Sequence, residues 1–259
     1  MSGPDVSAER FAAETARRVL GVDAELWDVW PRQGAYDVRL TYADGRNGAM
    51  EVTTYAAEGV PQLESLLSRD RFQWPQPAGA RWRWRLRPAT PRILPWLTQH
   101  YADLILICEQ HGVTRPDLLD PRLLPDGVYE RALDADLIGD SSLPPSQHGV
   151  DVLPPILGPV GDADITVVPA ELDRILTLDT YAKRIHKVVN AGEAEAHLFL
   201  GLDLSAMQLA AADALAFSTA LPPPPIRTYG LTHLWLLPRF SRRVLLWHGG
   251  GWTQHDPFD

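Results

Sequence analysis

The chain has 259 residues, of which 45% are hydrophobic and 22% charged, proportions that are ordinary for a soluble globular protein. Its net charge of −9 excludes a broad basic surface that coats nucleic acid, although it leaves room for a local basic cleft. The sequence has no apolar run long enough for a membrane span and no secretory leader, so we expect a cytoplasmic protein without a membrane partner. The single cysteine, Cys108, excludes an intramolecular disulfide, and the eight histidines show no metal-ligand spacing.

The first predicted element is a helix from Ser7 to Leu20, which begins at a capping serine and ends before Gly21. Glu14 borders the apolar stripe of this helix. Residues 24–30 predict a strand, which is followed by a turn at 31–34.

Residues 36–55 predict a β-hairpin, because two alternating runs flank a turn rich in Asp, Gly and Asn. Alternation places one apolar set on the core face: Val38, Leu40, Tyr42, Met50 and Val52.

The other face of the hairpin is polar. A turn centred near Gly45 would pair Asp37 with Thr53 and Arg39 with Glu51. Asp37 and Glu51 are then diagonal neighbours about 7 Å apart at the backbone, and a hard divalent cation could lie between their carboxylates. The alternative is a cross-strand ion pair between Arg39 and Glu51, with Asp37 in solvent.

This pattern, Asp37 followed by Glu51-Val52-Thr53, resembles the PD-(D/E)XK nuclease superfamily. Thr53 stands where that family has a lysine. The resemblance implies a restriction-endonuclease-like α/β fold, in which a helix, a three-strand meander and further helices pack on a mixed sheet. It also implies Mg²⁺ or Mn²⁺ held by Asp37 and Glu51, with Glu14 on the first helix as a third, outer ligand.

Lysine is rare in this chain. Of 24 basic residues only Lys183 and Lys187 are lysines, a bias that a GC-rich genome favours. They lie four residues apart and so share one face of a predicted helix that ends before Gly192. Family members sometimes carry the catalytic lysine on a neighbouring helix, so either residue is a candidate replacement for Thr53. The alternative is a solvated helix face without a role in catalysis.

Residues 81–87 alternate strictly between arginine and apolar residues, which predicts a strand. Its arginines, Arg81, Arg83 and Arg85, would lie on one face and could contact nucleic-acid phosphates, while its tryptophans are buried. The alternative is an edge strand kept soluble by its charges.

The rest of the chain predicts a single domain over 1–259, with residues 113–162 as an irregular, Pro-rich embellishment that could bind a protein partner. The other predicted elements are helices at 91–112, 128–135 and 205–217, and strands at 165–168, 197–203, 233–237 and 243–247.

Three functions are compatible with these features. The first is a metal-dependent nuclease in which Asp37 and Glu51 bind the ion and Lys183 or Lys187 stabilises the phosphate charge. The second is a nuclease-like scaffold without activity that acts as a protein-interaction module, which Thr53 and the acidic pI favour. The third is an unrelated α/β protein whose hairpin matches by chance.

Overall fold

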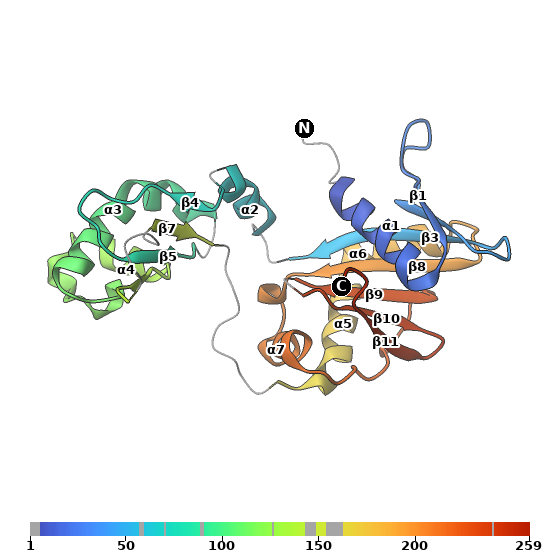
Figure 1. The fold of residues 1–259 in the computed structure, drawn as a ribbon. Coiled ribbons are helices and arrows are strands. Elements are labelled where there is room, and N and C mark those ends of the chain that lie inside the picture. The colour runs from blue at the N-terminus through green and yellow to red at the C-terminus, as the bar shows by residue number, and fades with distance from the viewer. Residues whose placement is uncertain are drawn as a thin grey trace. The chain divides into compact units, whose positions relative to one another are not determined.

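The structure is a computed structural model that describes residues 6–56, 60–69, 71–88, 91–125, 127–142, 149–153, 163–239 and 241–259. It contains two compact units, one of Met1–Ala56 with Leu157–Asp259 and the other of Ala57–Ile156 (Figure 1). We expected one domain over 1–259. The contacts instead group Ala57–Ile156 around a sheet and a hydrophobic core of its own. No described helix is long and apolar enough to cross a membrane.

The first unit is built on a seven-stranded mixed sheet. Strands β3, β8 and β9 in its centre run parallel, and the pairs at both edges are antiparallel. In spatial order the strands are β1 (Asp23–Leu26), β2 (Val38–Thr41), β3 (Asn47–Tyr55), β8 (Glu195–Leu202), β9 (His233–Pro238), β10 (Val244–His248) and β11 (Gly251–His255).

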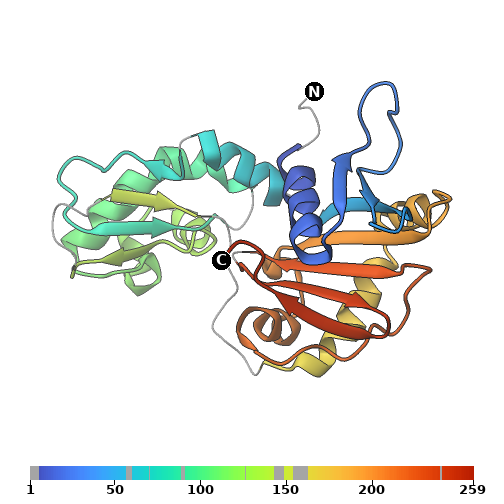
Figure 2. The ribbon, with the colours of Figure 1, turned by 45° about the vertical axis from the view of Figure 1, so that its right-hand side comes forward.

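Helices cover both faces of this sheet. Helix α1 (Val6–Leu20) packs on one face through Ala12, Ala13 and Ala16, whose small side chains allow a close approach to the strands. The other face is covered by α5 (Val168–Leu176), α6 (Asp179–Val189) and α7 (Leu209–Phe217) (Figures 1 and 2). The predicted α/β class, with an N-terminal helix followed by a strand meander, is therefore confirmed.

The hairpin has the predicted faces but a different register. Val38, Leu40 and Met50 are buried under α1. Arg39 pairs with Ala49 instead of Glu51, a shift of two residues that leaves every side chain on its predicted face. The turn is one residue earlier than expected because the Asp44 carboxylate accepts hydrogen bonds from the Arg46 backbone and side chain.

Two other predictions for this unit need correction. The strand expected at 24–30 is present but ends at Leu26, and the one expected at 165–168 is a 3₁₀ helix (Ile165–Val167) that leads into α5. Strand β8 pairs in parallel with β3 and β9. Beyond β10, Gly249 and Gly250 adopt positive φ values of 56° and 88°, which allow a tight turn into the unpredicted strand β11.

The second unit has a four-stranded sheet in the order β4 (Gln73–Trp74), β7 (Gly149–Val152), β5 (Arg83–Leu86) and β6 (Ile138–Asp140). Its helices are α2 (Val60–Arg69), α3 (Leu94–Gln110) and α4 (Val128–Leu133). The predicted arginine-rich strand is β5, and it lies between β7 and β6, so the alternative interpretation as an edge strand was wrong.

The segment expected to be irregular, 113–162, contains α4, β6 and β7. Two of its parts, 143–148 and 154–162, which include most of its proline clusters, lie outside the described residues. The proposed role of this segment in binding a protein partner stays a prediction.

Candidate functional site

The candidate site lies on the face of β3 that α6 covers. Met50 and Val52 point toward α1, so strand alternation directs Glu51 to the opposite side. The Glu51 side chain is 2% exposed and meets two cations from α6. Arg184 Nη1 donates to Glu51 Oε1 at 2.7 Å, and Lys187 Nζ donates to the same oxygen at 3.2 Å.

Asp37 lies beside Glu51, immediately before β2. Its backbone N–H donates to the carbonyl oxygen of Met50 at 3.1 Å, and its Oδ2 accepts from the N–H of Val52 at 2.7 Å. Met50 and Val52 are the two neighbours of Glu51 in β3. These bonds hold both carboxylates at one position along the strand.

Each carboxylate keeps an oxygen that could bind a ligand. Lys187 Nζ is 2.8 Å from Glu51 Oε2, but the two are not in hydrogen-bonding geometry, and Oε2 is buried without a hydrogen bond. Asp37 uses only Oδ2 for hydrogen bonding within the described chain. Carboxylate oxygens are the ligands that Mg²⁺ and Mn²⁺ prefer, so the pair has the right donor type for such an ion.

Both carboxylates are destabilised as anions. Burial raises the pKa of Asp37, against a lowering by its hydrogen bond from Val52 and by the charges of Lys187 and Arg184. Burial also raises the pKa of Glu51, and the neighbouring charge of Asp37 raises it further, despite the hydrogen bond from Lys187.

A structural ion pair elsewhere in the same unit shows the opposite behaviour. Glu171 is also buried, but its two hydrogen bonds from Arg174 lower its pKa. Two acids crowded together with raised pKa values are typical of a functional site, because an added cation would stabilise both.

The structure brings only one of the two candidate lysines to the acids. Lys187 is the lysine at Glu51, whereas Lys183, one turn earlier, is exposed and makes no ion pair with a described residue. Arg184 was not predicted. It lies three residues before Lys187 on the same helix face, so the spacing rule that selected the lysines could have found it.

The alternative ion pair between Arg39 and Glu51 does not form, because the register places Ala49 opposite Arg39. Thr53 shares its strand face with Glu51, two residues further along β3.

Glu14 is separated from this site by the sheet. It forms ion pairs with Arg17 and Arg18 on α1, which packs on the opposite face. The structure therefore does not bring Glu14 together with Asp37 and Glu51.

The arginines of the predicted nucleic-acid strand belong to the second unit. Arg83 pairs with Asp151 at 2.8 Å, and Arg81 lies 3.8 Å from the buried carboxylate of Glu109. Arg85 is exposed. Two of the three charges thus have acidic partners, and phosphate binding by this strand stays a prediction.

A second polar cluster lies on the α1 face of the sheet, where Glu195, His197 and His233 have ligand atoms within 4.8 Å of one another. Sequence spacing did not reveal it, because the two histidines are 36 residues apart and meet only through the pairing of β8 with β9. The Trp235 indole N–H donates to His197 Nδ1 at 3.2 Å. A neutral His197 therefore has its proton on Nε2, which faces Glu195 at 3.3 Å. In this arrangement His197 Nε2 is a hydrogen-bond donor to the Glu195 carboxylate. A metal ion bound to His197 Nε2 would have to displace the proton on that nitrogen.

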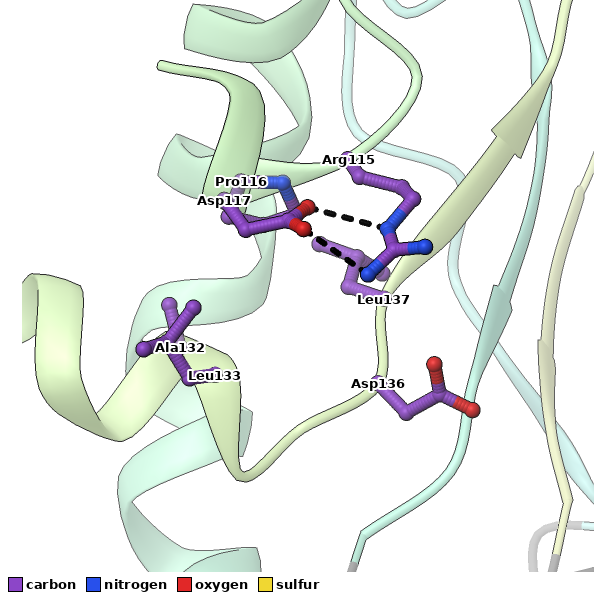
Figure 3. Close-up of a pocket in the computed structure, with 7 residues that line it drawn as sticks. All are labelled: Arg115, Pro116, Asp117, Ala132, Leu133, Asp136 and Leu137. Atoms are coloured by element: carbon purple, nitrogen blue, oxygen red, sulfur yellow. Dashed lines mark hydrogen bonds and ion pairs between the residues drawn. The ribbon is translucent and has the colours of Figure 1, made fainter. Parts of the chain in front are cut away.

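A cavity of about 210 Å³ lies in the second unit (Figure 3). Arg115 and Asp117 form a two-bonded ion pair at its wall, and Asp136, whose carboxylate points away from that pair, binds Arg87. The charged side chains that line this cavity are thus engaged in ion pairs.

No family model, curated protein or solved structure matches this chain. Its function must be inferred from the site itself.

Proposed function

We propose that the protein is a metal-dependent nuclease with a restriction-endonuclease-like first unit, whose active site comprises Asp37, Glu51 and Lys187. The observation that supports this most is the Lys187 ammonium group 2.8 Å from Glu51 Oε2. An ammonium group from α6 thus reaches the acidic pair. It could replace the lysine that the resembled motif has at the position of Thr53.

In this proposal Asp37 and Glu51 would hold Mg²⁺ or Mn²⁺ through the carboxylate oxygens that accept no hydrogen bond from a described residue. When bound, the ion supplies polarisation of the phosphate and a water of lowered pKa. Arg184 fixes the Glu51 carboxylate through Oε1, and Oε2 is left without a hydrogen bond.

Lys187 has a different role from Arg184. Its side chain is 30% exposed, whereas the Glu51 side chain that it contacts is 2% exposed. A compact ammonium beside Glu51 could also donate a hydrogen bond to a phosphate oxygen. We assign to it the stabilisation of charge on the phosphate in the transition state.

The second candidate function is an inactive scaffold that binds a protein. It is favoured by Thr53 and by the two cations, Arg184 and Lys187, that pair with Glu51. The two functions differ in whether the acidic pair binds a metal.

The test is incubation of plasmid, single-stranded DNA and RNA with the protein in Mg²⁺, in Mn²⁺ or in chelator. We expect metal-dependent cleavage by the wild type and none by Glu51→Gln. Glu14→Gln is the matched control, since it removes a surface carboxylate from the other face of the sheet, and it should cleave normally. Absence of cleavage on all substrates, together with no heat on Mg²⁺ titration, would favour the scaffold.

A further inference from the structure

The loop between β1 and β2, which ends at Asp37, exposes a large aromatic side chain. Trp30 is 81% exposed, and its neighbour Val29 is 40% exposed. The loop projects from the sheet beyond β1 (Figure 2). An indole in water is unfavourable, and exposed tryptophans of this kind are typical of binding surfaces.

This loop has a fixed internal structure. The backbone N–H of Arg32 donates to the carbonyl of Val29 at 2.6 Å, and Gly34 N–H donates to the Asp28 carboxylate at 2.7 Å. At its base, Trp27 stacks on Tyr36 with a centroid separation of 6.1 Å. Such a loop presents Trp30 with little conformational entropy left to lose on binding.

The loop is also tied to the acidic pair. Trp27 N–H donates to the carbonyl of Asp37 at 2.7 Å. The base of the loop is therefore joined to Asp37 by a backbone hydrogen bond as well as by the chain itself.

Two arginines add positive charge to this region. The guanidinium groups of Arg32 and Arg39 lie 3.7 Å and 4.5 Å from the centroid of the Trp27 ring. Neither guanidinium group forms an ion pair with a described carboxylate. This holds even though Glu25 is the cross-strand neighbour of Arg39. The Nε atom of Arg39 is also buried without a hydrogen bond. In a chain with a net charge of −9, two guanidinium groups without a described carboxylate partner, at the base of a loop that exposes an indole, fit an anionic, aromatic ligand.

We propose that this loop is a stacking platform for single-stranded nucleic acid, with Trp30 under an unpaired base and Arg32 and Arg39 on the adjoining phosphates. The inference rests on the proposed nuclease function and specifies its substrate. Single strands are favoured over duplex because a base in a duplex has both faces stacked on its neighbours, whereas an unpaired base can stack on an indole.

The test is binding measured by fluorescence anisotropy, with a labelled oligothymidylate of about 15 nucleotides and a duplex of equal length. All proteins carry Glu51→Gln, so that cleavage does not interfere. We expect Trp30→Ala to weaken single-strand binding by about 5- to 150-fold, with a much smaller effect on the duplex. Trp30→Phe should retain most of the affinity. Phe217→Ala is the control, because Phe217 is an aromatic residue of the same unit that is 65% exposed at the end of α7.

Two results would overturn the inference: unchanged single-strand binding by Trp30→Ala, or equal losses on both ligands. The first would make the loop a surface for a protein partner instead. The proposed function has a separate readout. If cleavage needs Glu51 but binding ignores Trp30, the nuclease stands without the platform. If binding needs Trp30 but no substrate is cleaved, the platform stands without the nuclease.

Discussion

Replacement of Lys187 by alanine is the most direct test of the relocated lysine. The change removes the ammonium group 2.8 Å from Glu51 Oε2 but leaves Arg184 bound to Oε1 at 2.7 Å. Removal of one partner from a buried pair costs about 3–5 kcal/mol when nothing replaces it. Since Arg184 still neutralises Glu51 and Lys187 is partly exposed, we expect a smaller loss of folding stability, about 1–2 kcal/mol.

The loss of activity should be larger than the loss of stability suggests. Removal of one group that stabilises transition-state charge typically lowers kcat by about 10²–10³. Single-turnover cleavage of a labelled oligonucleotide in saturating Mg²⁺ measures this step. Lys183→Ala, one turn away on the same helix, is the matched control and should cleave at the wild-type rate.

A second lysine can test the geometry directly. Thr53 lies on the same strand face as Glu51, so Thr53→Lys places an ammonium group beside the acidic pair from the strand. We expect this change to restore part of the activity lost in Lys187→Ala. If Lys187→Ala alone cleaves at the wild-type rate, the hypothesis that Lys187 replaces the motif lysine is refuted, whatever the rate of the double variant.

Three further predictions concern stability. Because burial raises the pKa of Asp37, its anion disfavours folding, so Asp37→Asn should abolish cleavage yet leave the melting temperature unchanged or higher, as calorimetry can measure. The pKa of Glu195 is lowered to about 2 and that of His233 to about 3, so the folded state binds fewer protons than the unfolded state. Unfolding free energy should therefore fall as pH decreases below about 6.5, by up to about 1.4 kcal/mol per pH unit for His233, and His233→Gln should flatten this slope in pH-dependent denaturant titrations. In the second unit, Glu109 accepts the Trp84 indole N–H at 3.0 Å and two backbone N–H groups, so Glu109→Gln should destabilise that unit by about 2–4 kcal/mol in denaturant titrations without changing cleavage.

Much of the first unit could be predicted from local sequence. The alternation of Val38, Leu40 and Met50 defined the buried face of the hairpin, and its Gly-rich turn defined where the strands reverse. The register could not be obtained in this way. It depends on the Asp44 carboxylate, which closes the turn one residue earlier through Arg46.

The parts that sequence did not reveal depend on contacts between distant segments. The separate second unit forms because β7 pairs with both β4 and β5, which lie more than sixty residues earlier in the chain. His197 and His233 likewise meet only through the pairing of two parallel strands. Local periodicity cannot specify which strands become neighbours.

The rarity of lysine was a chemical signal, and it narrowed the candidates to two. The choice between them required the position of α6 across β3, which directs Lys187 and Arg184 to Glu51 and leaves Lys183 in solvent. Helical spacing alone could not make that choice, since all three residues lie within about one turn.

The pKa directions at this site connect its chemistry to its position in the fold. A carboxylate that served only to hold α6 on β3 would be stabilised by its partners, as Glu171 is by Arg174. Glu51 has two cationic partners and still has a raised pKa, because burial and Asp37 together outweigh them. A bound divalent ion would relieve that repulsion, so metal affinity should decline on acidification at a higher pH than for an ordinary glutamate. If Mg²⁺ binding proved independent of pH through the range in which Glu51 titrates, the acidic pair would not be the metal site.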